Sequence, residues 1–333
     1  MSSPSHGRRM AAIVVLVPVM VALALWAFAW PAARTAPRDL PLGVAGPTAA
    51  VAQMEQRLTQ KEGAFEIHRY ADEAAARDAL QERTVYGAVV VTDGGPKLLT
   101  ASAAGPAVAQ LLQQAVSAQA SATGASVQVV DVVPAPEADP RGAAVSASVL
   151  PLALAGVAAG ATVTLLGLRG LRAVGTLVGA AALTGLVATA ITHSWLGVVT
   201  GDWWAVAGVL GLSTLAVAAG PAGLGALLGR PGIGLGALLV VLLGNAFSGV
   251  ASAPEMLPRP AGAIGQWLPP GAGGSLLRSV SFFDGAAATG PVFTLTWWVV
   301  LGLGAVLLGG TLRRRAHSEA PVSDRAPAPA RSV

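Results

Sequence analysis

The side chains best suited to acid–base or metal chemistry gather in one short segment of the chain. Its charged residues are Asp72, Glu73, Arg77, Asp78, Glu82 and Arg83. Several carboxylates on one helix could bind a divalent cation. Acidic and basic residues that alternate along a helix are nevertheless more typical of a solvated surface. We therefore predict a solvated helix over 72–83, with no metal site and no cofactor.

Signature motifs of ATP hydrolysis and of hydrolases are absent from the sequence. It contains no GxxxxGK[ST] loop, no HExxH and no GxSxG. The lack of cysteine excludes disulfides, thiolate metal sites and cysteine nucleophiles. No basic cluster is interleaved with aromatic residues, so nucleic acid is not an expected partner. The sequence predicts that this chain is not an enzyme.

The composition instead indicates a membrane protein. Of 333 residues, 53% are hydrophobic and 11% are charged, whereas soluble domains carry about 25% charged residues. Residues 34–142 hold 21 of the 38 charged residues, and residues 143–312 hold only eight. This distribution predicts a polar domain inserted into a polytopic α-helical membrane protein.

The first apolar run, Met10–Trp30, is long enough to cross a bilayer of about 30 Å. A signal peptide is the alternative, since Ala27-Phe28-Ala29 resembles a cleavage site. The run is longer than the usual signal core of ~7–15 residues, and Trp26 and Trp30 are typical of a membrane interface. We interpret it as an uncleaved transmembrane helix that follows a short cytoplasmic segment, residues 1–9.

Five further spans are expected within residues 143–312, before a disordered cytoplasmic tail at 313–333. They are Ala143–Leu168, Ala173–Thr192, Trp203–Leu228, Gly232–Gly249 and Val292–Leu312. Four glycine pairs with small-xxx-small spacing would permit close helix approach, although a glycine-rich chain also produces such pairs by chance. The pairs are Gly156 with Gly160, Gly175 with Gly179, Gly225 with Gly229, and Gly232 with Gly236.

Arginine placement predicts the orientation of these six spans. With the N-terminus inside, most loop arginines fall on the cytoplasmic side, as the positive-inside rule requires. These are Arg8, Arg9, Arg169, Arg172, Arg230 and Arg313 to Arg315. Both termini are then cytoplasmic, and residues 34–142 lie outside the cell membrane.

Residues 34–142 alternate between strand-like and helix-like segments, which predicts a small α/β domain. The expected strands are Leu40–Ala45, Phe65–Tyr70, Val85–Val91, Lys97–Thr100 and Val127–Val132. The expected helices are Thr48–Lys61, Asp72–Arg83 and Gly105–Ala122. Val85–Val91 is continuously apolar, as in a strand buried on both faces.

Residues 251–290 contain too many prolines for a span and too many apolar residues for a free loop. Two short re-entrant helices would explain this composition. Asn245 and Ser248, one helical turn apart just before it, either line a translocation path or bond another helix. The candidate path and re-entrant residues are Asn245, Ser248, Pro254, Pro258, Trp267, Pro269 and Arg278.

The chain resembles the permease subunits of ABC type-2 exporters that carry a large extracytoplasmic domain between spans one and two. The resemblance rests on the six-span plan, the insert with Val85-Tyr86-Gly87-Ala88-Val89-Val90, and the stretch from Asn245 to Arg278. It implies a homodimer or heterodimer of permeases in a bacterial plasma membrane, driven by a separate cytoplasmic ATPase. It also implies export of lipids, glycans, drugs or peptides.

The short link Arg169–Arg172 is the candidate contact for that ATPase, although these arginines could equally serve topology or bind lipid phosphate. The predicted spans hold no Asp, Glu, Lys or His at mid-depth, which argues against a proton-coupled carrier. The competing hypothesis is a membrane-anchored extracytoplasmic receptor or envelope accessory protein without transport activity. The sequence does not identify a substrate.

Overall fold

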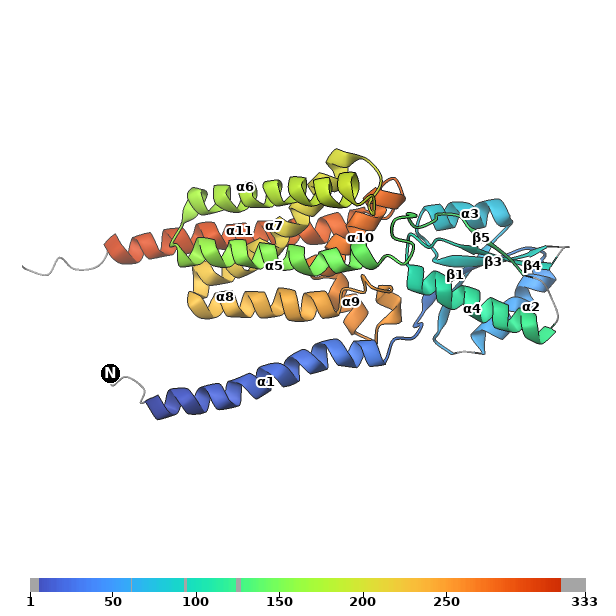
Figure 1. The fold of residues 1–333 in the computed structure, drawn as a ribbon, viewed down its shortest axis with the longest axis horizontal. Coiled ribbons are helices and arrows are strands. Elements are labelled where there is room, and N and C mark those ends of the chain that lie inside the picture. The colour runs from blue at the N-terminus through green and yellow to red at the C-terminus, as the bar shows by residue number, and fades with distance from the viewer. Residues whose placement is uncertain (1–5, 61, 93–94, 124–126, 319–333) are drawn as a thin grey trace, which may run out of the picture.

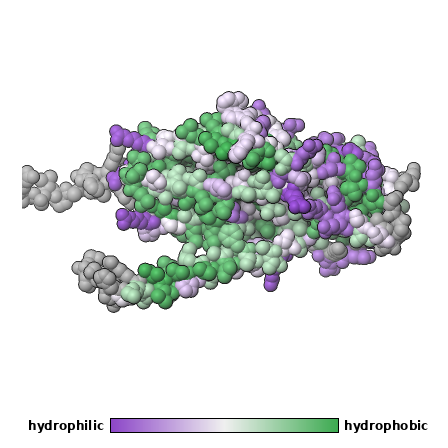
Figure 2. All heavy atoms as spheres, in the orientation of Figure 1, coloured by the Kyte–Doolittle hydropathy of each residue, from purple (hydrophilic) through white to green (hydrophobic). Residues whose placement is uncertain are grey.

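The protein consists of a small α/β domain set on one end of a bundle of apolar helices (Figure 1). The computed structural model describes residues 6–60, 62–92, 95–123 and 127–318. Hydrophobic side chains cover the visible face of the bundle and of α1, whereas hydrophilic side chains dominate the α/β domain (Figure 2). This division matches the uneven charge distribution of the sequence.

The α/β domain contains a mixed five-stranded sheet in the order β2-β1-β3-β4-β5. Its strands are β1 (Leu40–Ala45), β2 (Phe65–Tyr70), β3 (Gly87–Thr92), β4 (Gly95–Thr100) and β5 (Gln128–Asp131). Its helices are α2 (Thr48–Thr59), α3 (Glu73–Gln81) and α4 (Pro106–Thr123). β1 pairs in parallel with β2 and β3, and β3 pairs antiparallel with β4. Every predicted strand and helix of the domain is present; β1 and β2 have the predicted ends, and the ends of the other elements are shifted.

Helices cover both faces of the central strand β3, which explains its continuous apolar sequence. Ala88 and Val90 pack with Leu80 of α3 on one face. Val89 packs with Val108 of α4 on the other face. The two faces therefore form two separate hydrophobic clusters on either side of one sheet.

The bundle contains most of the remaining helices. They are α1 (His6–Ala33), α5 (Ala143–Leu165), α6 (Gly170–Thr189), η1 (Ala190–Trp195), α7 (Trp203–Leu228), α8 (Arg230–Ala237), η2 (Leu238–Gly244) and α11 (Thr289–Ser318). Five of the described helical segments are long and apolar enough to cross a membrane: Ile13–Ala33, Ala143–Leu165, Gly170–Trp195, Trp203–Leu228 and Thr289–Thr311.

The segment predicted as the fifth span is shorter than expected. The apolar helix formed by α8 and η2 covers Arg230–Gly244, whereas the prediction extended to Gly249. The chain leaves the helical path before Gly249, whose φ of 68° is a left-handed conformation that glycine adopts readily. Beyond it lie η3 (Pro254–Met256), α9 (Ala261–Gln266) and α10 (Pro269–Phe282), where we predicted two short helices.

Helix α7 is the centre of the bundle, in contact with α5, α6, α8, α10 and α11. A Cβ atom at Gly156 of α5 would lie 2.6 Å from Val217 Cγ1 of α7, so only glycine permits this approach. A Cβ atom at Gly236 of α8 would likewise lie 2.6 Å from Pro221 Cα of α7. A Cβ atom at Gly175 or Gly179 of α6 would have no neighbour within 4 Å. At Gly225 of α7 a Cβ atom would lie 2.8 Å from Thr164 Cγ2. The glycine spacing therefore marks packing in α5, α7 and α8 and is incidental in α6.

The two ends of the bundle differ. The domain end carries the α/β domain, α9 and α10, whereas the far end carries the start of α1, the α5–α6 link and the end of α11 (Figure 1). Helix α11 continues to Ser318, so residues 313–318 of the predicted disordered tail are helical. The predicted termini at 1–5 and 319–333 lie outside the described residues.

We predict that Gly156→Leu destabilises the bundle and Gly179→Leu does not. The leucine at 156 would collide with Val217 and with the backbone of α7, and overpacking of this kind costs about 1–3 kcal/mol. Thermal unfolding of the detergent-purified chain measures the difference. Equal unfolding temperatures for the two variants would show that α5 and α7 do not approach so closely.

Candidate functional site

Buried and half-buried polar side chains gather where the α/β domain meets the bundle. We call this group, formed by Arg83, Tyr86, Glu255 and Arg278, the junction cluster. Arg83 and Tyr86 come from the α/β domain, whereas Glu255 lies in η3 and Arg278 in α10. The cluster therefore joins segments separated by more than 150 residues of sequence.

Tyr86 and Glu255 are joined by a hydrogen bond within the cluster. The Tyr86 hydroxyl donates to Glu255 Oε2 at 2.9 Å. Burial and the nearby carboxylate both raise the pKa of Tyr86. The phenol therefore keeps its proton and remains a hydrogen-bond donor to Glu255.

Arg83 reaches across the junction to α10. Its Nη1 donates to the Ser275 carbonyl at 2.9 Å and also to Ser279 Oγ. The guanidinium carbon lies 5.3 Å from the centre of the Phe283 ring, within cation–π distance. Burial lowers the pKa of Arg83. The predicted solvated helix face is thus wrong for Arg83 and suits Glu73, which pairs with Arg77 and Lys97.

Arg278 is 6% exposed and holds the turn that follows η2. Its Nη2 donates to the Val250 carbonyl, which also accepts a hydrogen bond from Ser146 Oγ of α5 at 3.2 Å. One carbonyl thereby ties α5 and α10 to the turn between η2 and η3. Among the candidate path residues, Arg278 is the one that belongs to the cluster.

The other candidate path residues lie around the junction in different settings. Ser248 Oγ donates to the Asn245 carbonyl at 2.8 Å, so this pair stabilises its own turn. Pro254 adjoins Glu255, Pro258 is buried, and Pro269 begins α10. Trp267 is exposed, and its carbonyl accepts from Trp298 Nε1 at 2.9 Å. Whether any of these residues lines a transport path stays a prediction.

Sequence reasoning missed Arg83, Tyr86 and Glu255 as members of one site. Arg83 is separated by 196 residues from Ser279, to which it donates. The available signal was weak: Glu255 is the one acidic residue between Asp202 and Asp284. A lone acid in an apolar segment indicates a buried partner, without identifying it.

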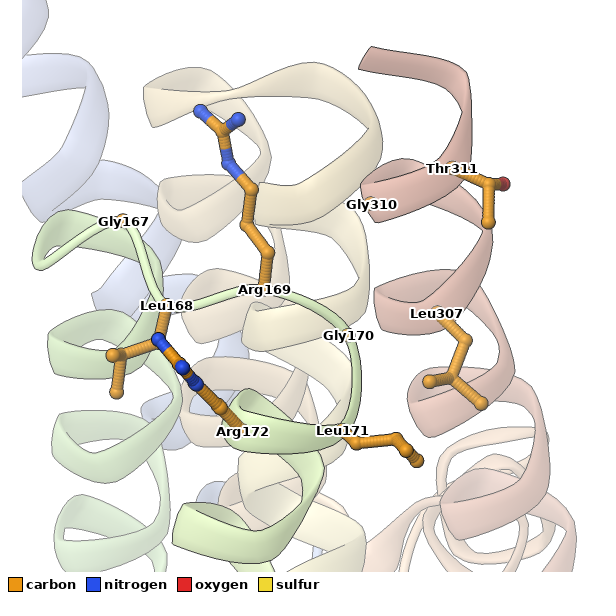
Figure 3. A pocket seen from close by; sticks show the side chains of 9 residues that line it. All are labelled: Gly167, Leu168, Arg169, Gly170, Leu171, Arg172, Leu307, Gly310 and Thr311. Atoms are coloured by element: carbon orange, nitrogen blue, oxygen red, sulfur yellow. The ribbon is translucent and has the colours of Figure 1, made fainter. Parts of the chain in front are cut away.

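A second site lies at the far end, on the predicted ATPase contact. A cavity of about 620 Å³, which we call the link pocket, opens beside the α5–α6 link (Figure 3). Its lining residues are Gly167, Leu168, Arg169, Gly170, Leu171, Arg172, Leu307, Gly310 and Thr311. Arg169 and Arg172 are exposed, and their guanidinium groups point in different directions (Figure 3).

The comparisons with known proteins concern the first part of the chain. Residues 8–149 match the family model described as ABC-2 family transporter protein. No curated protein and no solved structure matches the chain. The predicted resemblance to ABC type-2 permeases is thereby confirmed over these residues, which include α1 and the α/β domain. The match supports a multi-pass membrane permease of an ABC exporter.

We predict that Arg278→Gln destabilises the folded chain by about 1–3 kcal/mol, because the buried Val250 carbonyl loses its charged donor. Arg259→Gln is the matched control. Arg259 is exposed and pairs with Asp39, and a surface pair contributes about 0–1 kcal/mol. Chemical denaturation in detergent compares the two variants. A loss at Arg259 as large as that at Arg278 would contradict the structural importance of the Val250 contact.

Proposed function

We propose that the chain is the membrane-spanning permease subunit of an ATP-driven exporter and is powered by a separate ATPase subunit. The observation that carries this proposal is the family match together with the arrangement of the two ends. The α/β domain lies at one end of the bundle, and the arginine-bearing link lies at the other. A partner could then act on one end of the bundle while the α/β domain lies beyond the other.

Residue types at the two ends support an extracytoplasmic α/β domain. Arg169, Arg172 and Arg230 are exposed at the far end, as expected of a cytoplasmic surface. Large exposed tryptophans lie near the domain end, where an aromatic belt would meet the membrane interface. They are Trp26, Trp195, Trp204, Trp267 and Trp297. Both termini would accordingly be cytoplasmic, in a bacterial plasma membrane.

The chain path favours α8 with η2 as a sixth crossing. Helix α7 ends at the far end and α11 begins at the domain end, so the intervening chain has to return along the bundle (Figure 1). Arg230–Gly244 makes this return and rises about 22 Å at 1.5 Å per residue. This is shorter than the ~30 Å hydrocarbon core, and local bilayer thinning would accommodate the difference.

The energy for transport would come from the partner, because the sequence contains no phosphate-binding loop and no predicted proton relay. The link pocket offers a concave, basic surface for such an ATPase. Helix α1 contacts the bundle mainly near its C-terminal end. There the rings of Trp26 and Trp30 pack against the Phe247 ring, with centroid distances of 6.1 and 6.4 Å. Its remaining apolar surface suits a second permease copy or lipid. The substrate is left open among the classes that the family exports.

We predict that Ala71→Cys reacts with an impermeant maleimide added outside intact cells and that Leu171→Cys does not. Both positions are exposed, one in the α/β domain and one in the link, and the chain has no cysteine of its own. Labelling of Leu171→Cys after permeabilisation is the control for reactivity. Labelling of Leu171→Cys alone from outside would reverse the proposed orientation.

We predict that the double variant Arg169→Gln, Arg172→Gln uncouples ATP hydrolysis from transport by at least tenfold, because it removes both positive charges of the link pocket. The double lysine variant keeps the charge that governs topology. If the arginines serve only insertion, the lysine variant should behave as wild type, and the glutamine variant should be missing from the membrane. Co-purification of the ATPase with each variant separates these outcomes. Correct insertion and unchanged coupling in the glutamine variant would remove the link pocket from the docking surface.

A further inference from the structure

A second cavity, of about 220 Å³, opens between the α/β domain and the segment formed by α9 and α10. We call it the junction pocket. Its polar lining consists of Arg83, Tyr86, Glu255, Gln266 and Ser275. It is smaller than the ~300–1,000 Å³ typical of drug-sized ligands. A pocket of this size suits a headgroup rather than a whole lipid or drug.

The junction cluster beside this pocket holds more positive than negative charge. Arg83 and Arg278 bring two guanidinium groups, whereas Glu255 is the single carboxylate of the cluster. Arg83 donates both of its hydrogen bonds from Nη1. Its Nε and Nη2 have no acceptor among the described residues. Arg83 is half-buried, and a guanidinium in such a site with unused donors gains from an anion that can accept more than one hydrogen bond.

Gln266 and Glu255, which also line the pocket, offer further hydrogen bonds to such a ligand. The Gln266 amide donates one hydrogen bond to the Ser248 carbonyl at 2.9 Å and retains a second N–H. Tyr86 occupies Glu255 Oε2, which leaves the other carboxylate oxygen as an acceptor for a hydroxyl or ammonium group. The pocket thus presents several donors and one unused acceptor oxygen, and a halide, which only accepts hydrogen bonds, would leave that oxygen without a partner.

The depth of the pocket favours phosphate over other anions. Gln266 directly precedes the exposed Trp267, which accepts a hydrogen bond from Trp298, and these residues fall at the proposed membrane interface. Pro291, at the start of α11, lines the same pocket. Arginine matches the geometry of phosphate oxygens in a bidentate manner. Phosphate esters are the anions that occur at this depth.

We propose that the junction pocket binds a phosphate ester whose alcohol portion carries a hydroxyl or ammonium group. Arg83 holds the phosphate, Gln266 adds a donor, and the free oxygen of Glu255 accepts from the alcohol portion. The ligand is either the headgroup of a membrane lipid or a water-soluble phosphate ester. The site is complete within this chain and does not depend on the proposed transport activity, whereas the choice of phosphate rests on the membrane placement proposed above.

The first test is binding of glycerol phosphate to the full chain in a phosphate-free sugar detergent, measured by isothermal titration calorimetry. We expect saturable binding that weakens at least tenfold in Arg83→Gln. Arg77→Gln, in the neighbouring helix α3, should bind as wild type, because Arg77 pairs with Glu73 and does not line the pocket. Equal binding by all three proteins would overturn the assignment to this pocket.

A second pair of variants compares an added negative charge with a neutral side chain of the same size, and neither variant removes a side chain that the ligand would contact. Ala287 lines the pocket with a φ of 56°, a conformation that Asn and Asp adopt more readily than most residues. Ala287→Asp should weaken binding at least tenfold by repelling the phosphate, and the equally sized Ala287→Asn should not. This comparison remains decisive if Arg83→Gln fails to fold. An unchanged affinity in Ala287→Asp would contradict the proposal.

A second experiment, with lipids, distinguishes a lipid headgroup from a soluble phosphate ester. The same proteins are incubated with phosphatidylglycerol or with diacylglycerol, and retained lipid is measured by native mass spectrometry. Retention of phosphatidylglycerol that requires Arg83 and exceeds that of diacylglycerol identifies a lipid headgroup. Binding of glycerol phosphate without lipid retention identifies a soluble ester. Absence of Arg83-dependent binding in both arms overturns the proposal.

Discussion

The helical part of the structure depends on the close approach of backbones at α7. In hydrocarbon there is little hydrophobic gain from helix association, so packing contacts have to hold the spans together. Helix α7 supplies a surface of small buried residues, among them Ala218, Ala219, Gly220 and Ala222. Glycines of α5 and α8 fit against it without a side chain between the backbones. The positions of α10 and α11, and with them the junction, follow from this central contact.

The α/β domain is not an independent body attached by linkers, because its core is completed by the bundle. Met256 of η3 belongs to the cluster that contains Leu42 and Val89 on one face of the sheet. Phe283, just after α10, belongs to the cluster around Leu80 on the other face. The Met256 carbonyl also accepts hydrogen bonds from the Ala36 backbone and from the Arg38 side chain. The domain and the segment around α9 and α10 therefore share their packing.

Local pattern was sufficient to predict most elements, because burial dictates which residues repeat along a helix or strand. The apolar run of β3 and the length of α7 are examples. Partners across long sequence separations were beyond such reasoning. Arg83 and Arg77 lie in one segment predicted as a single helix, but α3 ends at Gln81 and Arg83 has a φ of 60°. Its side chain donates to α10, whereas Arg77 pairs with Glu73 of its own helix. The early end of η2 and the incidental Gly175 likewise depend on neighbours in space that no periodicity records.

Helix α5 physically connects the two sites. At its start, the carboxylate of Asp139 accepts hydrogen bonds from the backbone N–H groups of Ala143, Ala144 and Val145 at 2.8–3.1 Å. These bonds fix the helix to the segment that leaves the α/β domain. One turn later Ser146 shares the Val250 carbonyl with Arg278 of the junction cluster.

The other end of α5 leads directly into the link pocket, about 34 Å away for a helix of 23 residues. Helices are stiff along their axes, and α5 is packed tightly against α7 for part of this length. A displacement imposed on the link at the far end would therefore move Ser146 relative to Val250 to the extent that α5 stays rigid across Pro151. The contact that receives this movement is the one that holds Arg278 beside the junction pocket. Under the proposed function, a movement that an ATPase imposes at the link would thus be transmitted along α5 to the junction cluster.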